Sequence, residues 1–139
     1  MNRFSAPLLI GLLLLAPCLA RAAEPASADA VEVATDWLSL VDAGTYEESW
    51  RQSGALFRQA ITKEQWSQAL GAARTSLGEL RTRRLESRTE ATALPGVPDG
   101  RYVVMQFAAP FASRAPALET VTTALEADGH WRVVGYFIK

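Results

Sequence analysis

Residues 118–139 have the sequence LETVTTALEADGHWRVVGYFIK, and this stretch decides the fold class. Two runs rich in valine, threonine and aromatic residues flank Asp128-Gly129, a pair that is typical of a two-residue hairpin turn of type I′. Such a turn places Glu126 opposite Trp131 and fixes the register of the rest of both strands. The stretch therefore predicts two antiparallel strands joined by a tight turn.

Both faces of this predicted hairpin are substantially apolar. In the last strand, Trp131 and Phe137 fall on one face, and Tyr136 and Ile138 fall on the other. An antiparallel sheet with one solvated face shows a clean alternation of apolar and polar residues. We therefore expect the second face to be covered by a partner subunit, by a bound ligand or by the curl of the sheet on itself.

Two further strand-like runs precede the hairpin, and helices precede those strands. The runs are ELRTRRLESRTEA, from residue 79, and RYVVMQF, from residue 101, and loops rich in glycine and proline follow them. Before residue 79 the apolar residues recur at helical spacing. Helices followed by a four-stranded antiparallel meander predict an α+β fold.

The helix boundaries follow from local signals. Asp29, Thr45 and Thr62 are each followed three residues later by Glu or Gln, which is the capping-box pattern. Gly44 and Gly78 stand where glycines end helices. These signals predict three helices over residues 30–43, 46–60 and 63–77.

The N-terminus has the features of a secretory signal peptide. In MNRFSAPLLIGLLLLAPCLARAAE, a basic residue precedes a short apolar run and a small-x-small cleavage site that ends at Ala22. The apolar run is much shorter than the roughly 20 residues that span a bilayer, so we expect no transmembrane segment. We therefore expect a signal peptide over 1–22, a flexible linker over 23–29 and one domain over 30–139, periplasmic or secreted. The alternative is a lipoprotein anchored through Cys18, with a structural role in the envelope.

Composition limits the chemistry. Cleavage removes the one cysteine, and the chain has one histidine, so we expect no zinc or copper site. No glycine-rich phosphate loop and no G-x-S-x-G motif is present, so we expect no common cofactor. The formal net charge of −1 does not suggest a nucleic-acid partner.

The segments LPGVPDGRYVVMQF and DGHWRVVGYFIK, with WLSLVDAGTYEESW and SLGELRTRRL ahead of them, resemble the domain-of-unknown-function family 4019. The resemblance covers essentially the whole mature chain. It implies a small exported bacterial domain with helices on a curved sheet, similar to the cone-shaped NTF2-like (cystatin-like) class. No catalytic residue is assigned in that family, so the resemblance supplies none.

Glu119 and Tyr136 are the residues best placed for catalysis. The predicted register makes them diagonal neighbours on one face, where an acid and a tyrosine in a cone pocket could act as in an isomerase or hydratase. Arg132 lies on the same predicted face, and it could instead form an ion pair with Glu119. His130 begins the last strand beside an exposed turn, and we do not expect it to be catalytic.

The remaining candidates are binding residues. We expect a ligand or interface surface on the sheet to include Tyr102, Gln106, Trp131, Arg132 and Phe137. The other three tryptophans lie on helical apolar stripes and are expected in the core.

Arginines of the run RTRRLESR alternate with glutamates. We interpret them as solvated salt-bridge partners, with an anion or partner site as the alternative. Arg74 is expected to pair with a carboxylate.

Taken together, these features predict a non-enzymatic exported domain. It would bind a small apolar ligand or a partner protein through the sheet, alone or as a homodimer. The alternatives are the isomerase or hydratase with Glu119 and Tyr136 and the anchored envelope component.

Overall fold

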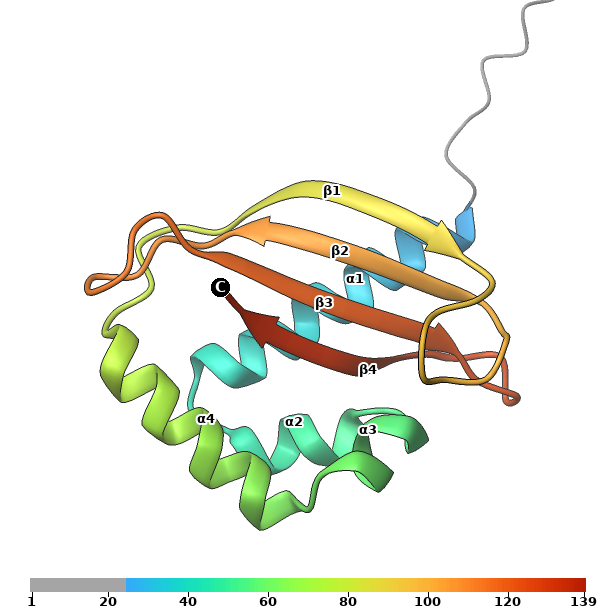
Figure 1. Cartoon of the computed structure of the whole chain (residues 1–139), viewed down its shortest axis with the longest axis horizontal. Coiled ribbons are helices and arrows are strands. Elements are labelled where there is room, and N and C mark those ends of the chain that lie inside the picture. The colour runs from blue at the N-terminus through green and yellow to red at the C-terminus, as the bar shows by residue number, and fades with distance from the viewer. Residues whose placement is uncertain (1–24) are drawn as a thin grey trace, which may run out of the picture.

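The computed structural model describes residues 25–139, in which four helices precede a four-stranded sheet (Figure 1). The helices are α1 (Pro25–Asp42), α2 (Tyr46–Gln52), α3 (Ala55–Ala60) and α4 (Lys63–Leu77). The strands are β1 (Arg84–Ala91), β2 (Tyr102–Ala108), β3 (Leu118–Leu125) and β4 (Trp131–Ile138). The predicted α+β class is confirmed, whereas the expected leader and Cys18 lie outside the described residues.

The sheet is a simple antiparallel meander with the order β1-β2-β3-β4, as predicted. α1 runs along one face of the sheet, against β2, β3 and β4 (Figure 1). α3 packs on β4, and α2 lies between α1 and α4. The helices therefore cover the half of the sheet that ends at β4, while β1 is exposed along nearly its whole length.

The core lies between α1 and the three covered strands. Its most buried large side chains include Leu38, Val41, Met105, Val121 and Val133. The rings of Trp37, Phe57, Trp66 and Tyr136 form a cluster with centroids 4.9–6.0 Å apart. Aromatic pairs at these separations add to the stability that burial provides.

The buried tryptophans are tied to the helices by hydrogen bonds. Trp37 Nε1 donates to the Ser49 carbonyl at 2.9 Å and to Ser53 Oγ at 3.0 Å. Trp66 Nε1 donates to Ser49 Oγ at 3.0 Å, and Trp50 Nε1 donates to the Ile61 carbonyl at 2.9 Å. The expectation that these three tryptophans serve the core is borne out for Trp37 and Trp66, and Trp50 is half-buried.

The predicted helix over residues 46–60 is wrong, because the chain breaks it into α2 and α3 at Ser53 and Gly54. Gly54 N–H donates to the Val133 carbonyl at the outer edge of β4, with an N···O distance of 2.7 Å. A Cβ on Gly54 would lie 2.8 Å from Val134 Cγ1, closer than real Cβ contacts. The break therefore brings the backbone into direct contact with the sheet edge.

One of the three predicted capping boxes is confirmed. Thr62 accepts from the N–H of Gln65 at 3.2 Å, and the Gln65 side chain accepts from the N–H of Thr62 at 3.1 Å. Thr45 precedes α2, but its hydroxyl donates to the Leu40 carbonyl instead, because the end of α1 lies beside it. The Asp29 cap is wrong because α1 begins at Pro25, a residue suited to the first helical turn, so most of the expected linker is helical.

The predicted type I′ turn is also wrong. Gly129 has a φ of 84°, but the residues before it have negative φ, so the turn has three central residues. As a result Trp131 pairs with Leu125 and not with Glu126. A bulge between Thr122 and Thr123 then shifts the register back.

The bulge decides which residues face the helices. Beyond it, Val121 pairs with Tyr136 and Glu119 pairs with Ile138, as the sequence predicted. Between the turn and the bulge, Trp131 and Val133 face the helices and are buried. They thus share a face with Tyr136, whereas the sequence predicted the opposite face. The prediction that Glu119 and Tyr136 are diagonal neighbours on one face is therefore correct, because two register differences cancel.

Candidate functional site

A cleft of about 320 Å³ lies between α4 and β4, and we call it the α4–β4 cleft. Its helix side is formed by Trp66, Ala69, Leu70, Ala73, Ser76 and Leu77. Ala69, Ala73 and Ser76 are spaced by four and three residues, so they share one face of α4. Because these side chains are small, α4 leaves open space beside the sheet edge.

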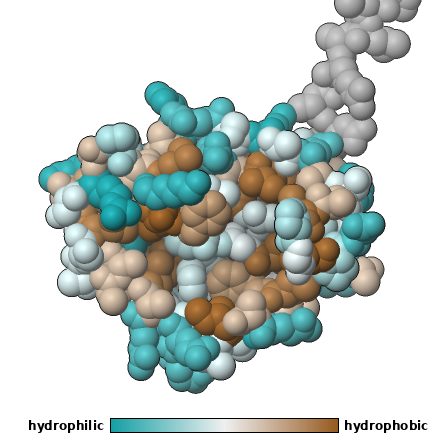
Figure 2. All heavy atoms as spheres, in the orientation of Figure 1, coloured by the Kyte–Doolittle hydropathy of each residue, from teal (hydrophilic) through white to brown (hydrophobic). Residues whose placement is uncertain are grey.

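The sheet side of the α4–β4 cleft is formed by the last residues of β4. Tyr136, Phe137 and Ile138 line it, and the ring of Tyr136 meets Trp66 edge to face at 6.0 Å. Hydrophobic residues also reach the surface across the middle of the face seen in Figure 2, and hydrophilic residues surround them. The cleft thus offers a mostly apolar surface that is open to solvent on one side.

Arg114 is the charged residue among those that line the cleft. It lies in the loop before β3, where its N–H donates to the Phe111 carbonyl at 3.1 Å and its carbonyl accepts from the Phe111 N–H at 2.8 Å. Its side chain is exposed, and within residues 25–139 it makes no ion pair.

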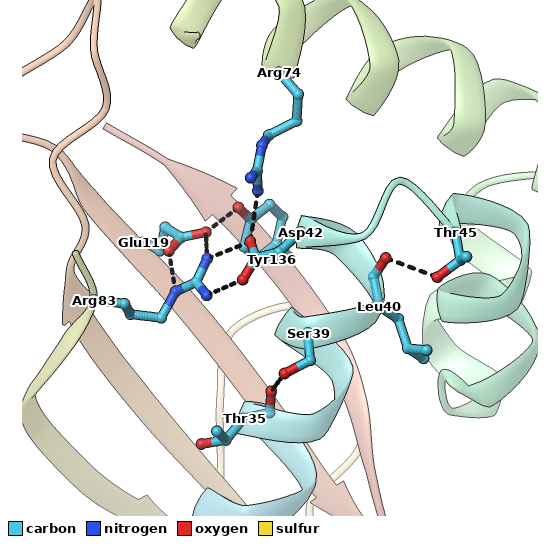
Figure 3. Close-up of polar contacts among 9 residues, drawn as sticks. All are labelled: Thr35, Ser39, Leu40, Asp42, Thr45, Arg74, Arg83, Glu119 and Tyr136. Carbon is cyan, nitrogen blue, oxygen red and sulfur yellow. Dashed lines mark hydrogen bonds and ion pairs between the residues drawn. The ribbon is translucent and has the colours of Figure 1, made fainter. Parts of the chain in front are cut away.

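An ionic network, buried at Glu119 and partly exposed at Asp42, joins four segments of the chain (Figure 3). Arg83 Nε donates to Glu119 Oε1 at 2.7 Å, and Arg83 Nη2 donates to Glu119 Oε2 at 3.3 Å. The same guanidinium holds Asp42, at the end of α1, through two bonds of 2.5 and 2.9 Å. Arg74 of α4 binds Asp42 at 3.0 Å. Two arginines and two carboxylates balance in charge, which is what burial of ions requires.

Tyr136 connects this network to the cleft. Its hydroxyl donates to Glu119 Oε2, while its ring lines the α4–β4 cleft. Burial raises the pKa of the Tyr136 hydroxyl well above its ordinary value of 10.0, and the charge of Glu119 raises it further. Tyr136 therefore stays protonated and keeps its donor on Glu119.

The arginines set the ionisation of the network. Burial alone would raise the pKa of Asp42, but hydrogen bonds and charges from Arg83 and Arg74 outweigh it and lower that pKa below 3.8. Burial would likewise lower the pKa of Arg83, yet Asp42 and Glu119 raise it. Asp42 and Arg83 therefore stabilise each other's charged forms.

The structure brings Glu119 and Tyr136 together but does not direct Glu119 into the cleft. Glu119 has no exposed surface, and both of its oxygens accept hydrogen bonds. The prediction that Arg132 could pair with Glu119 is wrong, because Arg132 binds Glu126 at 2.8 Å and Asp128 at 2.8 Å beside the β3–β4 turn. The partner is Arg83, which sequence reasoning placed among solvated salt bridges.

Arg83 escaped prediction because the run RTRRLESR does not form a strand from its start. β1 begins at Arg84, and the preceding residues cross over the end of α1. The Arg83 side chain is consequently 14 % exposed, while those of Arg81 and Arg84 are 61 % and 77 % exposed. The expectation of solvated arginines is correct for those two and wrong for Arg83, and the expected carboxylate partner of Arg74 is confirmed.

The structure separates the residues that were expected to form one ligand or interface surface. Trp131 and Tyr102 are largely buried, and the Tyr102 hydroxyl donates to the Pro98 carbonyl, yet both residues line a second pocket of about 380 Å³. Phe137 is 49 % exposed and reaches the α4–β4 cleft, whereas Gln106 pairs with Thr120 on the face away from the helices. Of the five expected residues, Phe137 alone lines the cleft.

His130 and the metal-ligating residue types add no further candidate site within the described residues. His130 is exposed in the β3–β4 turn, where its N–H donates to Asp128 Oδ1 at 3.1 Å. Within the described part of the chain, no three residues of the metal-ligating types come together. In the same part, no helix is both long enough and apolar enough to cross a membrane.

Comparison with known proteins gives a family but no assigned role. The model of a family described as "Protein of unknown function (DUF4019)" matches residues 33–136, which is more than half of the chain. No curated protein matches the chain. The cone-shaped class that the resemblance implied stays a prediction.

Proposed function

The chain belongs to the DUF4019 family, whose members have no assigned function, so its role must be inferred from its own site. We propose that it is a binding domain that holds a small apolar ligand, or an apolar group of a partner protein, in the α4–β4 cleft. The observation that carries the proposal is the apolar lining of a solvent-open cleft of about 320 Å³.

Packing supports this interpretation. Protein interiors are filled to the density of organic crystals, and open apolar space beside a core is costly unless it serves binding. Larger residues at Ala69 and Ala73 would fill the cleft without changing the sheet. Small residues on this face of α4 preserve a volume that stability alone would not maintain.

An isomerase or hydratase that uses Glu119 and Tyr136 has weaker support. A general base needs an oxygen that can reach the substrate, and both oxygens of Glu119 are engaged by Arg83 and Tyr136. The tyrosine hydroxyl also donates inward and not toward the cleft. The pair is better explained as the link between the ionic network and the cleft wall.

We place this binding function outside the cytoplasm, on the basis of the signal-peptide features of residues 1–22. The intact mass of the protein recovered from cells would test this. Loss of the first 22 residues supports export, and an added acyl mass on Cys18 would instead favour the anchored envelope component.

Self-association through the outer sheet face is a second candidate, favoured by the 49 % exposure of Phe137. Native mass spectrometry measures the subunit number directly. A dimer supports this candidate. A monomer contradicts it, and the binding function is then assigned to the cleft alone.

The cleft itself is tested by filling it. Ala73→Trp puts an indole into the cleft, and Ala72→Trp puts the same group on the exposed neighbouring position outside it. We expect the fluorescent probe N-phenyl-1-naphthylamine to bind wild type and Ala72→Trp alike, and Ala73→Trp about tenfold more weakly, since roughly 1.4 kcal/mol of contact is lost. Equal binding by both variants, or no binding by wild type, contradicts the proposal.

A further inference from the structure

We infer that Arg114 gives the α4–β4 cleft a preference for ligands that carry an anionic group at one end of an apolar body. This inference rests on the proposed binding function and specifies its ligand class. It follows from which polar groups line the cleft and which of them are already engaged.

Arg114 is a free cation on an apolar wall. It lines the cleft with Leu77 and Ile138, and its side chain has no carboxylate partner among residues 25–139. An arginine presents a planar fork of donors that binds a carboxylate or phosphate through two bonds. An anion held there would keep its alkyl part against β4 and α4.

The nearby negative charges do not compete for this position. Asp42 is bound by Arg83 and Arg74, and Glu119 is fully buried and bound by Arg83. Lys139 adds a second positive charge, since its Nζ lies 5.5 Å from the ring centroid of Phe137, which lines the cleft. Among the residues that line the cleft, Arg114 is the one with a charged side chain, so the lining itself carries a positive charge.

The other polar groups offer little to a neutral ligand. The Tyr136 hydroxyl donates to Glu119, so its proton is not available to a ligand. Ser76 contributes one hydroxyl at the end of α4. A ligand with a neutral polar end would thus gain few hydrogen bonds, whereas an anionic end gains a charged one.

The alternative is a structural role for Arg114, because basic residues near the C-terminus of a helix interact with its dipole. The carbonyls at the end of α4 already accept backbone bonds, with Gly78 N–H on Arg74 and Ser113 N–H on Leu77. A structural role would change stability and leave ligand preference unchanged. The two roles are therefore separated by measuring binding and unfolding on the same variants.

The test compares octanoate with octanol, which share the alkyl chain and differ in charge. We expect wild type to bind octanoate roughly three- to tenfold more tightly by calorimetry, which is the range for one partly exposed charged contact. Arg114→Gln should remove this difference and leave octanol binding unchanged. Arg88→Gln, on the exposed strand β1 away from the cleft, is the matched control and should keep it.

Charge reversal gives a positive readout. Arg114→Glu should prefer octylamine, as its ammonium form, over octanoate, while its urea midpoint stays close to that of Arg114→Gln. If wild type binds octanol and octanoate equally and Ala73→Trp weakens both, the binding function stands and the role of Arg114 is overturned. If wild type binds neither octanoate, octanol nor octylamine, the proposed function fails and the inference fails with it.

Discussion

Glu119 is a carboxylate without exposed surface in a sheet, and its charge is made tolerable by one guanidinium and one phenol. A buried ion pair contributes little net stability compared with apolar residues, but removing one partner leaves an uncompensated charge. Arg83 is therefore important because, without it, the buried Glu119 carboxylate has no positively charged partner. The same guanidinium also fixes the end of α1 through Asp42.

Arg83→Met should lower the free energy of unfolding by about 3–5 kcal/mol, because the buried Glu119 carboxylate then loses its guanidinium and keeps Tyr136 as its one side-chain partner. Urea denaturation measures the change. Arg81→Met is the matched control, since Arg81 is 61 % exposed, and it should change the free energy by less than about 0.5 kcal/mol. Similar effects from both substitutions would show that the network is not required.

Asp42 predicts how stability responds to acid. Its pKa is lower in the folded protein than its ordinary value of 3.8, so its contribution is fully present above pH 3.8. The contribution is lost as the pH falls through the folded pKa, because the carboxylate must then bind a proton that the arginines oppose. We expect the urea midpoint of wild type to fall more steeply between pH 5 and pH 2 than that of Asp42→Asn. Asp36→Asn, on the exposed side of α1, should follow wild type.

Residue identity alone predicted part of this site. The contact between Glu119 and Tyr136 could be predicted, because alternation along two strands places them on one face as diagonal neighbours. Arg83 was not visible, because its burial depends on how the loop before β1 crosses α1. Burial of a single arginine is a tertiary property, and the alternation of charges around it favoured the opposite interpretation.

Among the elements, α4 was predicted with the correct first and last residues, because a capping box marks its start and a glycine marks its end. The division between α2 and α3 was missed, since the apolar spacing continues across Ser53 and Gly54 and hides the contact of Gly54 with β4. The turn before β4 was mistaken because Asp-Gly also suits a three-residue turn whose last residue is Gly129. The bulge at Thr122 and Thr123 has no local sequence signal.

Two glycine substitutions test the element boundaries with opposite signs. Gly54→Ala should destabilise by about 1–3 kcal/mol, because its Cβ would lie 2.8 Å from Val134 Cγ1, although its φ of −72° suits any residue. Gly71→Ala, inside α4, should stabilise by about 0.5–1 kcal/mol, since its Cβ meets Tyr46 at an ordinary 3.6 Å. Thermal unfolding measures both. A stabilising Gly54→Ala would contradict the close approach of α2–α3 to β4.

At the scale of the whole molecule, the sequence predicted helices followed by a meander but not the α4–β4 cleft. A cleft is set by the distance that other contacts impose between two elements, and α4 is positioned by α2 and by Arg74. The expectation that both faces of the last hairpin need cover arose from the wrong register at Trp131. In the structure Trp131 and Val133 lie under the helices, and the outer face of the hairpin carries Thr122 and Gly135 beside the exposed Phe137.

The bond between Gly54 N–H and the Val133 carbonyl has a consequence for aggregation. An open strand edge is a template on which other chains can add strands and build fibrils. Here Gly54 occupies the first half of the β4 edge, and at the opposite edge β1 alternates arginine and glutamate from Arg84 to Glu90. These features hinder strand addition along β1 and along the first part of β4. The part of the β4 edge that they leave open is the short segment from Tyr136 to Ile138, which lines the α4–β4 cleft.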